Sequence, residues 1–449
     1  MSTLAGNPPM INQAKHSRAA NSDANKLSPE DRSAHGWYRF VLSYPPHLVR
    51  DYLERFEIRG DDPVLDPFCG TGTTIVECKK LGIPAVGIEA NPMALLAAQV
   101  KVDWSPDPDG LVQHARQVAA AALADLDRDG IADDPLPLFQ SIYPDRVFDL
   151  RTLCPEQMDL LLTDSISALP LHKTLVLLDH MERLCDSHYA RHERLALARA
   201  LVSDISNLHF GPEVGVGTIK PDAPVIAPWL NGVQEITGDL RTLPTGNGAP
   251  STVIHGDARY VDQVVAPGSI AAVITSPPYP NEKDYTRTTR LESVLLGLIH
   301  NKAELRALKH NLVRSNTRNV YKDDDDDQWV ASHPEIQRIA EAIEARRIAM
   351  GKDSGFERMY ARVTRLYFGG MAQHLANLRS VLRPGARLAY VVGDQASYLR
   401  VMIRTGQLLA DIAQSLGYEL VNIDLFRTRL ATATKEQLRE DVVVLRWPG

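Results

Sequence analysis

The stretch that decides the fold is Pro63–Gly82, PVLDPFCGTGTTIVECKKLG. It begins with a short apolar run, passes through a glycine-rich turn, and continues as a helical pattern that stops at Gly82. A second apolar run, PAVGIEA, follows directly, and Asn91 then stands where a helix N-cap is expected. Apolar strands that alternate with helices predict a parallel sheet with helices on both faces.

The same alternation returns near the end of the chain. STVIHGD, IAAVITSPPY and LRPGARLAYVVGD are expected to be strands, and ELVNIDLF and EDVVVLRW an antiparallel pair at one edge. We therefore predict an α/β, Rossmann-like fold with a doubly wound, mainly parallel sheet and two large helical insertions. The expected parts are a flexible N-terminal segment (1–34), a cofactor-binding half (35–104), a helical insertion that could recognise the target (105–250), and a catalytic half (251–449) containing a second helical insertion (281–379).

Composition restricts the class of protein. The 449 residues are 44% hydrophobic and 23% charged, and no stretch approaches the roughly 20 apolar residues that span a bilayer. The first 34 residues lack the apolar core of a secretion signal, and the four cysteines have no metal-ligand spacing, so we expect a cytoplasmic protein without a metal. The net charge of −7 does not suggest nucleic-acid binding by the chain as a whole, so local charge must decide.

The glycine-rich turn is suited to holding a nucleoside cofactor. Gly70 and Gly72 let the backbone approach a ligand, and the helix that follows offers free N–H groups. Glu89 ends the next strand, where its carboxylate can accept hydrogen bonds from ribose hydroxyls. The lysine of a triphosphate-binding loop is absent, and the spacing differs from that of dinucleotide enzymes.

The turn Asp66–Thr74, DPFCGTGTT, resembles the FxGxG cofactor motif of the amino-methylating DNA methyltransferases. The resemblance implies S-adenosylmethionine as cofactor and a phenylalanine that packs on it. It also extends upstream to Tyr44-Pro45-Pro46, and downstream to His255–Ala258, whose aspartate would bind the adenine amine. The implied cofactor residues are Tyr44, Asp66, Pro67, Phe68, Gly70, Gly72, Thr73, Thr74, Glu89, Asn91, Asp257 and Ala258.

A second motif, Thr275–Tyr279 (TSPPY), ends a strand at the edge where α/β proteins bind ligands. An acceptor side chain and a backbone carbonyl can bind the two N–H groups of an exocyclic amine, and the tyrosine can stack on a flipped base. SPPY is similar to the catalytic motif of N4-cytosine methyltransferases, whereas N6-adenine enzymes usually carry DPPY or NPPY. The implied catalytic residues are Ser276, Pro277, Pro278 and Tyr279. C5-cytosine methylation is not expected, because no cysteine follows a proline.

The segment after this motif is locally basic and is expected to contact phosphates of double-stranded DNA. The candidate residues are Lys283, Arg287, Arg290, Arg314, Arg318 and Lys322. The run Asp323–Asp327 is predicted to be a disordered, repelling loop.

Four functions remain open on the sequence. N4-cytosine DNA methylation is favoured over N6-adenine methylation. An RNA or protein amine methyltransferase and a non-catalytic DNA-binding regulator are further alternatives. By resemblance alone, the chain would act in restriction-modification or defence, with a partner from such a system.

Overall fold

The computed structural model describes residues 27–38, 43–133, 149–210, 213–244, 248–281, 283–430 and 437–449. Its centre is a seven-stranded sheet in the order β5-β2-β1-β6-β7-β9-β8. The first five strands in this order are mutually parallel, and β9 runs antiparallel to both β7 and β8. The strands are β1 (Val64–Asp66), β2 (Ala85–Glu89), β5 (Ser251–His255), β6 (Ile270–Thr275), β7 (Leu382–Gly393), β8 (Glu419–Leu430) and β9 (Gln437–Arg446).

Successive strand residues pack on opposite faces of the sheet. Val64 belongs to one buried cluster and Leu65 to the other, and Val442 and Val443 divide in the same way. This alternation follows from the two-residue repeat of a strand and explains the continuous apolar runs of the sequence. The sheet is therefore buried on both sides, as predicted for a doubly wound fold.

One face is covered by helices from the N-terminal half of the chain. These are α1 (Arg32–His35), α2 (Pro46–Arg55), α3 (Thr73–Lys80) and α4 (Pro92–Lys101). The predicted N-cap is present, because the Asn91 side chain accepts from the N–H groups of Met93 and Ala94. Residues 27–34 were expected to be flexible, but a short helix, η2 (Pro29–Asp31), and α1 occupy this segment, with Ala34 fully buried. Residues 1–26 lie outside the described part.

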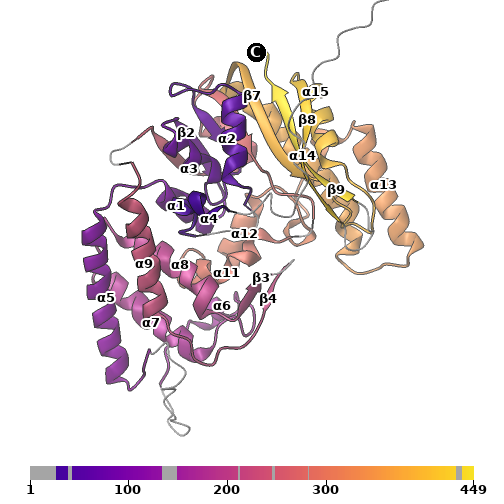
Figure 1. Ribbon diagram of the computed structural model, residues 1–449. Helices are drawn as coiled ribbons and strands as arrows, with labels where there is room; N and C mark the ends of the chain where they lie inside the picture. Colours follow the sequence, from indigo (N-terminus) through magenta and orange to yellow (C-terminus); the bar gives the residue numbers. More distant parts are fainter. Residues whose placement is uncertain are drawn as a thin grey trace, which may run out of the picture.

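The first insertion extends this face instead of forming a separate body (Figure 1). Its helices are coloured from purple to rose, and α8 lies beside α4 and α9 beside α1. They are α5 (Pro108–Arg128), α6 (Pro155–Met158), α7 (Ala168–Arg183), α8 (Ala190–Ala200) with the π-helix η4 (Leu201–Ile205), and α9 (Ile226–Leu240). A hairpin of β3 (Leu208–Phe210) and β4 (Val214–Val216) projects from this layer.

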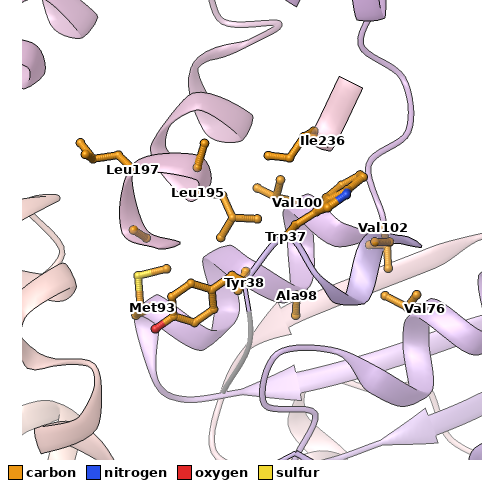
Figure 2. Packing of buried hydrophobic residues seen from close by; sticks show 14 of the residues in the cluster. Trp37, Tyr38, Val76, Met93, Ala98, Val100, Val102, Leu195, Leu197 and Ile236 are labelled. Atoms are coloured by element: carbon orange, nitrogen blue, oxygen red, sulfur yellow. The ribbon is translucent and has the colours of Figure 1, made fainter. Parts of the chain in front are cut away.

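Trp37 and Tyr38 join the insertion to the sheet. Figure 2 shows Trp37 next to Val100 of α4 and Ile236 of α9, and Tyr38 next to Met93 of α4. The indole N–H of Trp37 donates to Asp239 Oδ2 at 2.7 Å, and the Tyr38 hydroxyl donates to Glu292 Oε1 at 2.7 Å. The insertion therefore shares one hydrophobic core with the sheet.

Helices from the C-terminal half cover the other face. They are η5 (Ala258–Gln263), α13 (Pro334–Ala349), η8 (Glu357–Met359), α14 (Tyr360–Leu378), η9 (Arg379–Val381) and α15 (Thr405–Ser415). The sequence placed α14 in the second insertion, but α14 packs directly on the sheet core through Tyr367, Phe368 and Met371. The remainder of that insertion holds α10 (Tyr285–Thr288), α11 (Arg290–Leu295), α12 (Lys302–His310), η6 (Thr317–Asn319) and η7 (Asp326–Val330).

Candidate active site

A cavity of about 280 Å³ lies at the carboxyl ends of the parallel strands, where ligands bind in α/β folds. It joins the glycine-rich turn after β1, the acidic end of β2, the turn after β5 and the SPPY motif after β6. Its wall is formed by Ser43, Tyr44, Pro67, Phe68, Cys69, Gly70, Thr71, Thr73, Ile88, Glu89, Ala90, Asn91, Ala94, Gly256, Asp257, Ala258, Ser276, Pro277, Pro278, Tyr279, Asn281, Lys283, Tyr285, Asn311, Leu312, Val313, Ser315, Asn319, Val391, Phe426, Arg427, Arg429 and Glu440.

The two glycines of the turn have different tasks. Gly70 has φ 52°, and a Cβ added there would meet nothing within 4 Å, so its backbone is open on the cavity side. Gly72 has φ 87°, and a Cβ would lie 3.1 Å from the Ala98 Cβ. Gly72 thus permits the close packing of α3 on α4. It does not line the cavity, so the structure does not place it at the cofactor contact that the resemblance implies.

Glu89 is held in place by backbone donors. Its Oε2 accepts from the N–H of Gly70 at 2.8 Å and its Oε1 from the N–H of Asn91 at 2.7 Å. Burial raises the pKa of Glu89 to about 7. Each carboxylate oxygen keeps a lone pair for a further donor, so Glu89 can accept hydrogen bonds from hydroxyls of a ligand in the cavity.

Phe68 rests edge-on against His374, with ring centroids 5.0 Å apart and planes at 67°. Nδ1 of His374 lies 2.8 Å from the Ala258 carbonyl, and Nε2 lies 2.8 Å from the Tyr390 hydroxyl. A carbonyl can only accept, so Nδ1 carries the proton and Nε2 accepts from Tyr390. Burial lowers the pKa of His374 to about 4. A neutral imidazole on α14 therefore supports two walls of the cavity at once.

Asp66 and Thr74 lie behind the cavity wall and not in it. Asp66 is fully buried and accepts from the hydroxyls of Thr275 at 2.6 Å and Tyr44 at 2.9 Å. Thr74 donates to the Ile274 carbonyl at 3.0 Å. Burial raises the pKa of Asp66 to about 6. These two predicted cofactor residues instead tie the end of β1 to the end of β6 and hold Tyr44 against both.

The hydroxyl of Ser276 has a fixed direction. It donates to the Val391 carbonyl on β7 at 3.1 Å. Because its single proton is used there, the oxygen presents only acceptor lone pairs to the cavity. Pro277 and Pro278 supply no N–H at this point, so the strand end offers carbonyls without competing donors.

Tyr279 packs over a glycine of the neighbouring strand. A Cβ built on Gly393 of β7 would lie 2.8 Å from the Tyr279 ring, so any side chain there would displace the ring. The Tyr279 N–H donates to the Tyr285 hydroxyl at 3.4 Å. Burial raises the pKa of the Tyr279 phenol, which stays neutral and available for stacking.

Sequence reasoning missed the wall that β8 and β9 supply. Phe426, Arg427 and Arg429 come from β8 and Glu440 from β9, more than 140 positions after the SPPY motif. They reach the cavity because β9 inserts between β7 and β8. Arg427 and Arg429 stand two apart in LFRTRL and so share a strand face, which is the one signal that could have indicated them.

The short helix η6 was also missed. Asn319 is 1% exposed and lines the cavity, and its Oδ1 has no hydrogen-bond partner among the described residues. Buried polar atoms are nearly always paired. The side chain is thus an acceptor suited to an N–H donor of a ligand.

The six predicted phosphate contacts lie in four different surroundings. Lys283 lines the cavity, and Arg318 and Lys322 are exposed. Arg287 is half-buried, 3.8 Å from Glu213. Arg290 and Arg314 do not fit the prediction. Arg290 donates to Thr286 and to the Leu160 carbonyl, and Arg314 is 2% exposed and paired with Asp324.

The aspartate run is likewise not a repelling loop. Asp326 is buried and pairs with Arg259 at 2.7 Å, and Arg259 in turn pairs with Asp257 at 2.7 Å. Asp324 pairs with Arg314 at 2.7 Å. The prediction was wrong because Arg314, ten positions upstream of Asp324, and Arg259, far from Asp326 in sequence, neutralise two of the five carboxylates.

No cluster of three or more His, Cys, Asp or Glu side chains in the described part of the chain could hold a metal ion. No helix in the same residues is long and apolar enough to cross a membrane.

Comparisons with known proteins show similarity to DNA methyltransferases. A family model described as DNA methylase, of the N6/N4 type, matches residues 12–100. The type II methyltransferase M.BsoBI of Geobacillus stearothermophilus is 24% identical over 93% of this chain and 85% of its own length. M.AvaI of Nostoc sp. strain PCC 7120 is 22% identical over 95% of this chain and 88% of its own.

Among solved structures, TrmN from Thermus thermophilus matches over 90% of this chain and 48% of its own, with 11% identity and a TM-score of 0.28. The family model covers the glycine-rich turn, and the two relatives extend over nearly the whole chain, including both insertions. The chain is therefore similar to N6/N4-type DNA methylases over residues 12–100 and to type II methyltransferases over nearly its whole length.

Proposed function

We propose that this protein transfers a methyl group from S-adenosylmethionine to N4 of cytosine in double-stranded DNA. The observation that carries the proposal is the Ser276 hydroxyl, whose proton is committed to the Val391 carbonyl. The serine is therefore a neutral acceptor at the point where the target amine must sit. It shares one cavity with the glycine-rich turn and Glu89.

The cavity fits the cofactor that the family implies. When bound, S-adenosylmethionine would supply an electrophilic methyl group. Glu89 would accept from its ribose hydroxyls, Phe68 would pack against it, and Asp257 would accept from its adenine amine. The unpaired Oδ1 of Asn319 supports the fit, since the cofactor carries N–H donors that such an acceptor needs.

The protein's own part in the reaction is orientation. An exocyclic amine donates its lone pair to its ring and is a poor nucleophile. Ser276 Oγ and the Pro277 carbonyl would accept one N–H each, which favours the bent amine whose lone pair points away from the ring. Tyr279 would stack on the flipped base and keep that geometry.

Adenine is the second candidate target. Its N6 amine could occupy the same two acceptors, and the family includes both kinds of enzyme. The serine favours cytosine by resemblance to N4-cytosine enzymes. The names of the relatives as type II methyltransferases support a role in restriction-modification, with a partner from a restriction or defence system.

The test is nucleoside mass spectrometry of genomic DNA incubated with purified protein and S-adenosylmethionine. We expect N4-methylcytosine. Detection of N6-methyladenine would contradict cytosine as the target base but would leave the assignment of the active site intact. Methylation of RNA alone would contradict DNA as the substrate.

Ser276→Ala is the variant that tests the site. Loss of one oriented hydrogen-bonding group should lower the rate by about 10²- to 10³-fold, while cofactor affinity measured by calorimetry stays unchanged. Ser380→Ala is the control, since Ser380 is exposed and outside the cavity. An undiminished rate in Ser276→Ala would remove the serine from the mechanism.

A further inference from the structure

An Arg–Glu pair stands beside the proposed stacking tyrosine. Arg427 of β8 lies directly opposite Glu440 of β9 in the sheet register. Nε and Nη2 of Arg427 bind the two carboxylate oxygens of Glu440, the latter at 3.0 Å. The Glu440 side chain is 8% exposed and that of Arg427 is 21% exposed, and both line the cavity.

The pair is close to Tyr279. A Cβ built on Gly393 would lie 2.8 Å from the Tyr279 ring and 3.4 Å from Cγ of Glu440, so the ring and the glutamate stem stand over the same glycine. Burial raises the pKa of Tyr279, and the charge of Glu440 raises it further. Burial opposes the charge on Arg427, but the hydrogen bond and charge of Glu440 raise the pKa of Arg427, with a smaller contribution from Tyr279. The guanidinium thus belongs to the part of the cavity where a base would stack.

The same two strands carry a second pair of the same kind. Glu419 of β8 lies opposite Arg446 of β9, and the two are joined at 2.9 Å. Both are about half exposed and stand away from the cavity. An exposed pair of this type needs no function. Burying Arg427 with Glu440 costs desolvation that an apolar pair would avoid, which favours a use for the guanidinium.

The guanidinium has donors beyond those that Glu440 uses. Glu440 binds Nε and Nη2 of Arg427, and these two hydrogen bonds fix the plane of the guanidinium. Nη1 takes no part in the pair. Along the Watson–Crick edge of cytosine, the N4 amine is followed by two acceptors, N3 and O2. Along the corresponding edge of adenine, the N6 amine is followed by N1 and then by a C–H group. Only cytosine offers an acceptor at the far position.

We propose that Arg427, oriented by Glu440, donates a hydrogen bond to O2 of the flipped cytosine and so selects cytosine over adenine. This inference rests on the proposed function. With its amine bound at Ser276, adenine would place a C–H group opposite the guanidinium. The site would discriminate strongly against adenine, because adenine would leave a donor of the guanidinium without an acceptor. Arg429, 40% exposed in its side chain, stands nearer the solvent rim.

The experiment pairs a change in the enzyme with a change in one substrate atom. Once the modified site has been mapped on genomic DNA, two duplexes are made, with cytosine or 2-thiocytosine as target. Sulfur replaces O2 and is a weak acceptor. Initial rates are measured for the wild type, Arg427→Met, Arg427→Lys and the control Arg446→Met.

We expect the wild type and Arg446→Met to lose about 10- to 100-fold in rate on 2-thiocytosine, as for a hydrogen bond to a charged group. Arg427→Met should methylate cytosine more slowly than the wild type, and its rate on 2-thiocytosine should be nearly the same as its rate on cytosine. The loss of rate on 2-thiocytosine in Arg427→Lys should lie between those of the wild type and Arg427→Met. We call the ratio of the rate on cytosine to the rate on 2-thiocytosine the sulfur effect. An equal sulfur effect in all four proteins would overturn the proposal, and so would the absence of a sulfur effect in the wild type. Failure of the proposed function can be distinguished from failure of this inference, because the mapping of the modified base would then give adenine.

Arg427→Met could act through loss of folding, so cofactor affinity and thermal unfolding are measured alongside. Arg427→Lys keeps the positive charge near Glu440. If the methionine variant is unfolded, the ratio of the rates of Arg427→Lys on the two duplexes still tests the proposal. An effect of Arg427 on a phosphate would slow both duplexes equally, and that outcome also overturns the assignment to O2.

Discussion

His374 shows how one buried side chain connects the two halves of the cavity. Its ring supports Phe68 at 5.0 Å, its Nδ1 proton is donated to the Ala258 carbonyl, and its Nε2 accepts from Tyr390. Protonation would replace an acceptor by a donor facing the Tyr390 hydroxyl in a dry environment. The neutral form is therefore part of the folded structure.

This arrangement predicts a pH dependence of stability. Burial lowers the pKa of His374 to about 4 from the ordinary 6.5, so between these values the unfolded chain binds a proton that the folded chain does not. Stability is then lost as the pH falls. From pH 7 to pH 5 the loss from this residue should be about 2 kcal/mol.

Urea unfolding of the wild type and His374→Gln at both pH values measures that loss. The variant cannot titrate there, so its free energy of unfolding should fall by about 2 kcal/mol less than that of the wild type. His188→Gln is the control, because His188 is 81% exposed in its side chain. Equal falls in the wild type and His374→Gln would contradict the assignment.

Among the elements, η7 and η5 form a connection between the second insertion and the cofactor side of the cavity. Asp326 of η7 binds Nη1 of Arg259, and Asp257 binds Nη2. The same guanidinium donates to the His310 carbonyl at the end of α12 at 2.6 Å. One arginine therefore fixes the Asp257 turn and the loop that follows α12.

Asp326→Ala should remove one partner from this buried pair and leave the guanidinium partly uncompensated. We expect the free energy of unfolding to fall by about 3–5 kcal/mol, and cofactor affinity to fall because the Asp257 turn loses its support. Urea unfolding and calorimetric titration measure the two effects.

Asp323→Ala provides the matched control, since Asp323 belongs to the same acidic run and is exposed. It should change neither quantity. If Asp326→Ala also changed neither, the connection would be dispensable, and the burial of Asp326 would need another explanation.

At the scale of the whole molecule, the proposed DNA substrate must approach the side on which the cavity opens. Of the six predicted phosphate contacts, Arg318 and Lys322 have the exposure that such a contact requires. The double variant Arg318→Ala/Lys322→Ala should lower the salt dependence of DNA binding, with the slope of log K against log salt falling by about 2.

Fluorescence anisotropy over a range of salt concentrations measures that slope. Arg128→Ala/Arg241→Ala is the control, because Arg128 ends α5 and Arg241 follows α9 in the helical layer at the left of Figure 1. If both double variants lowered the slope equally, binding would depend on net charge alone and not on this segment.

The sequence by itself determined the local features. The apolar runs, the glycine-rich turn and the Asn91 cap follow from short-range propensities, and they predicted the parallel strands, the helices between them and the antiparallel pair at the edge. The glycine-rich turn and SPPY were recognisable because each is contiguous. Their meeting at one cavity follows from the rule that parallel strands end at a common edge.

Only the tertiary structure decided which polar groups pair, because pairing depends on distance in space and not along the chain. It buried Arg314 and Asp326 in ion pairs and moved Asp66, Gly72 and Thr74 behind the cavity wall. It also brought Arg427 and Glu440 beside Tyr279, because β9 returns between β7 and β8. No local pattern records such long-range neighbours, since burial and charge compensation arise only once the strands are in register.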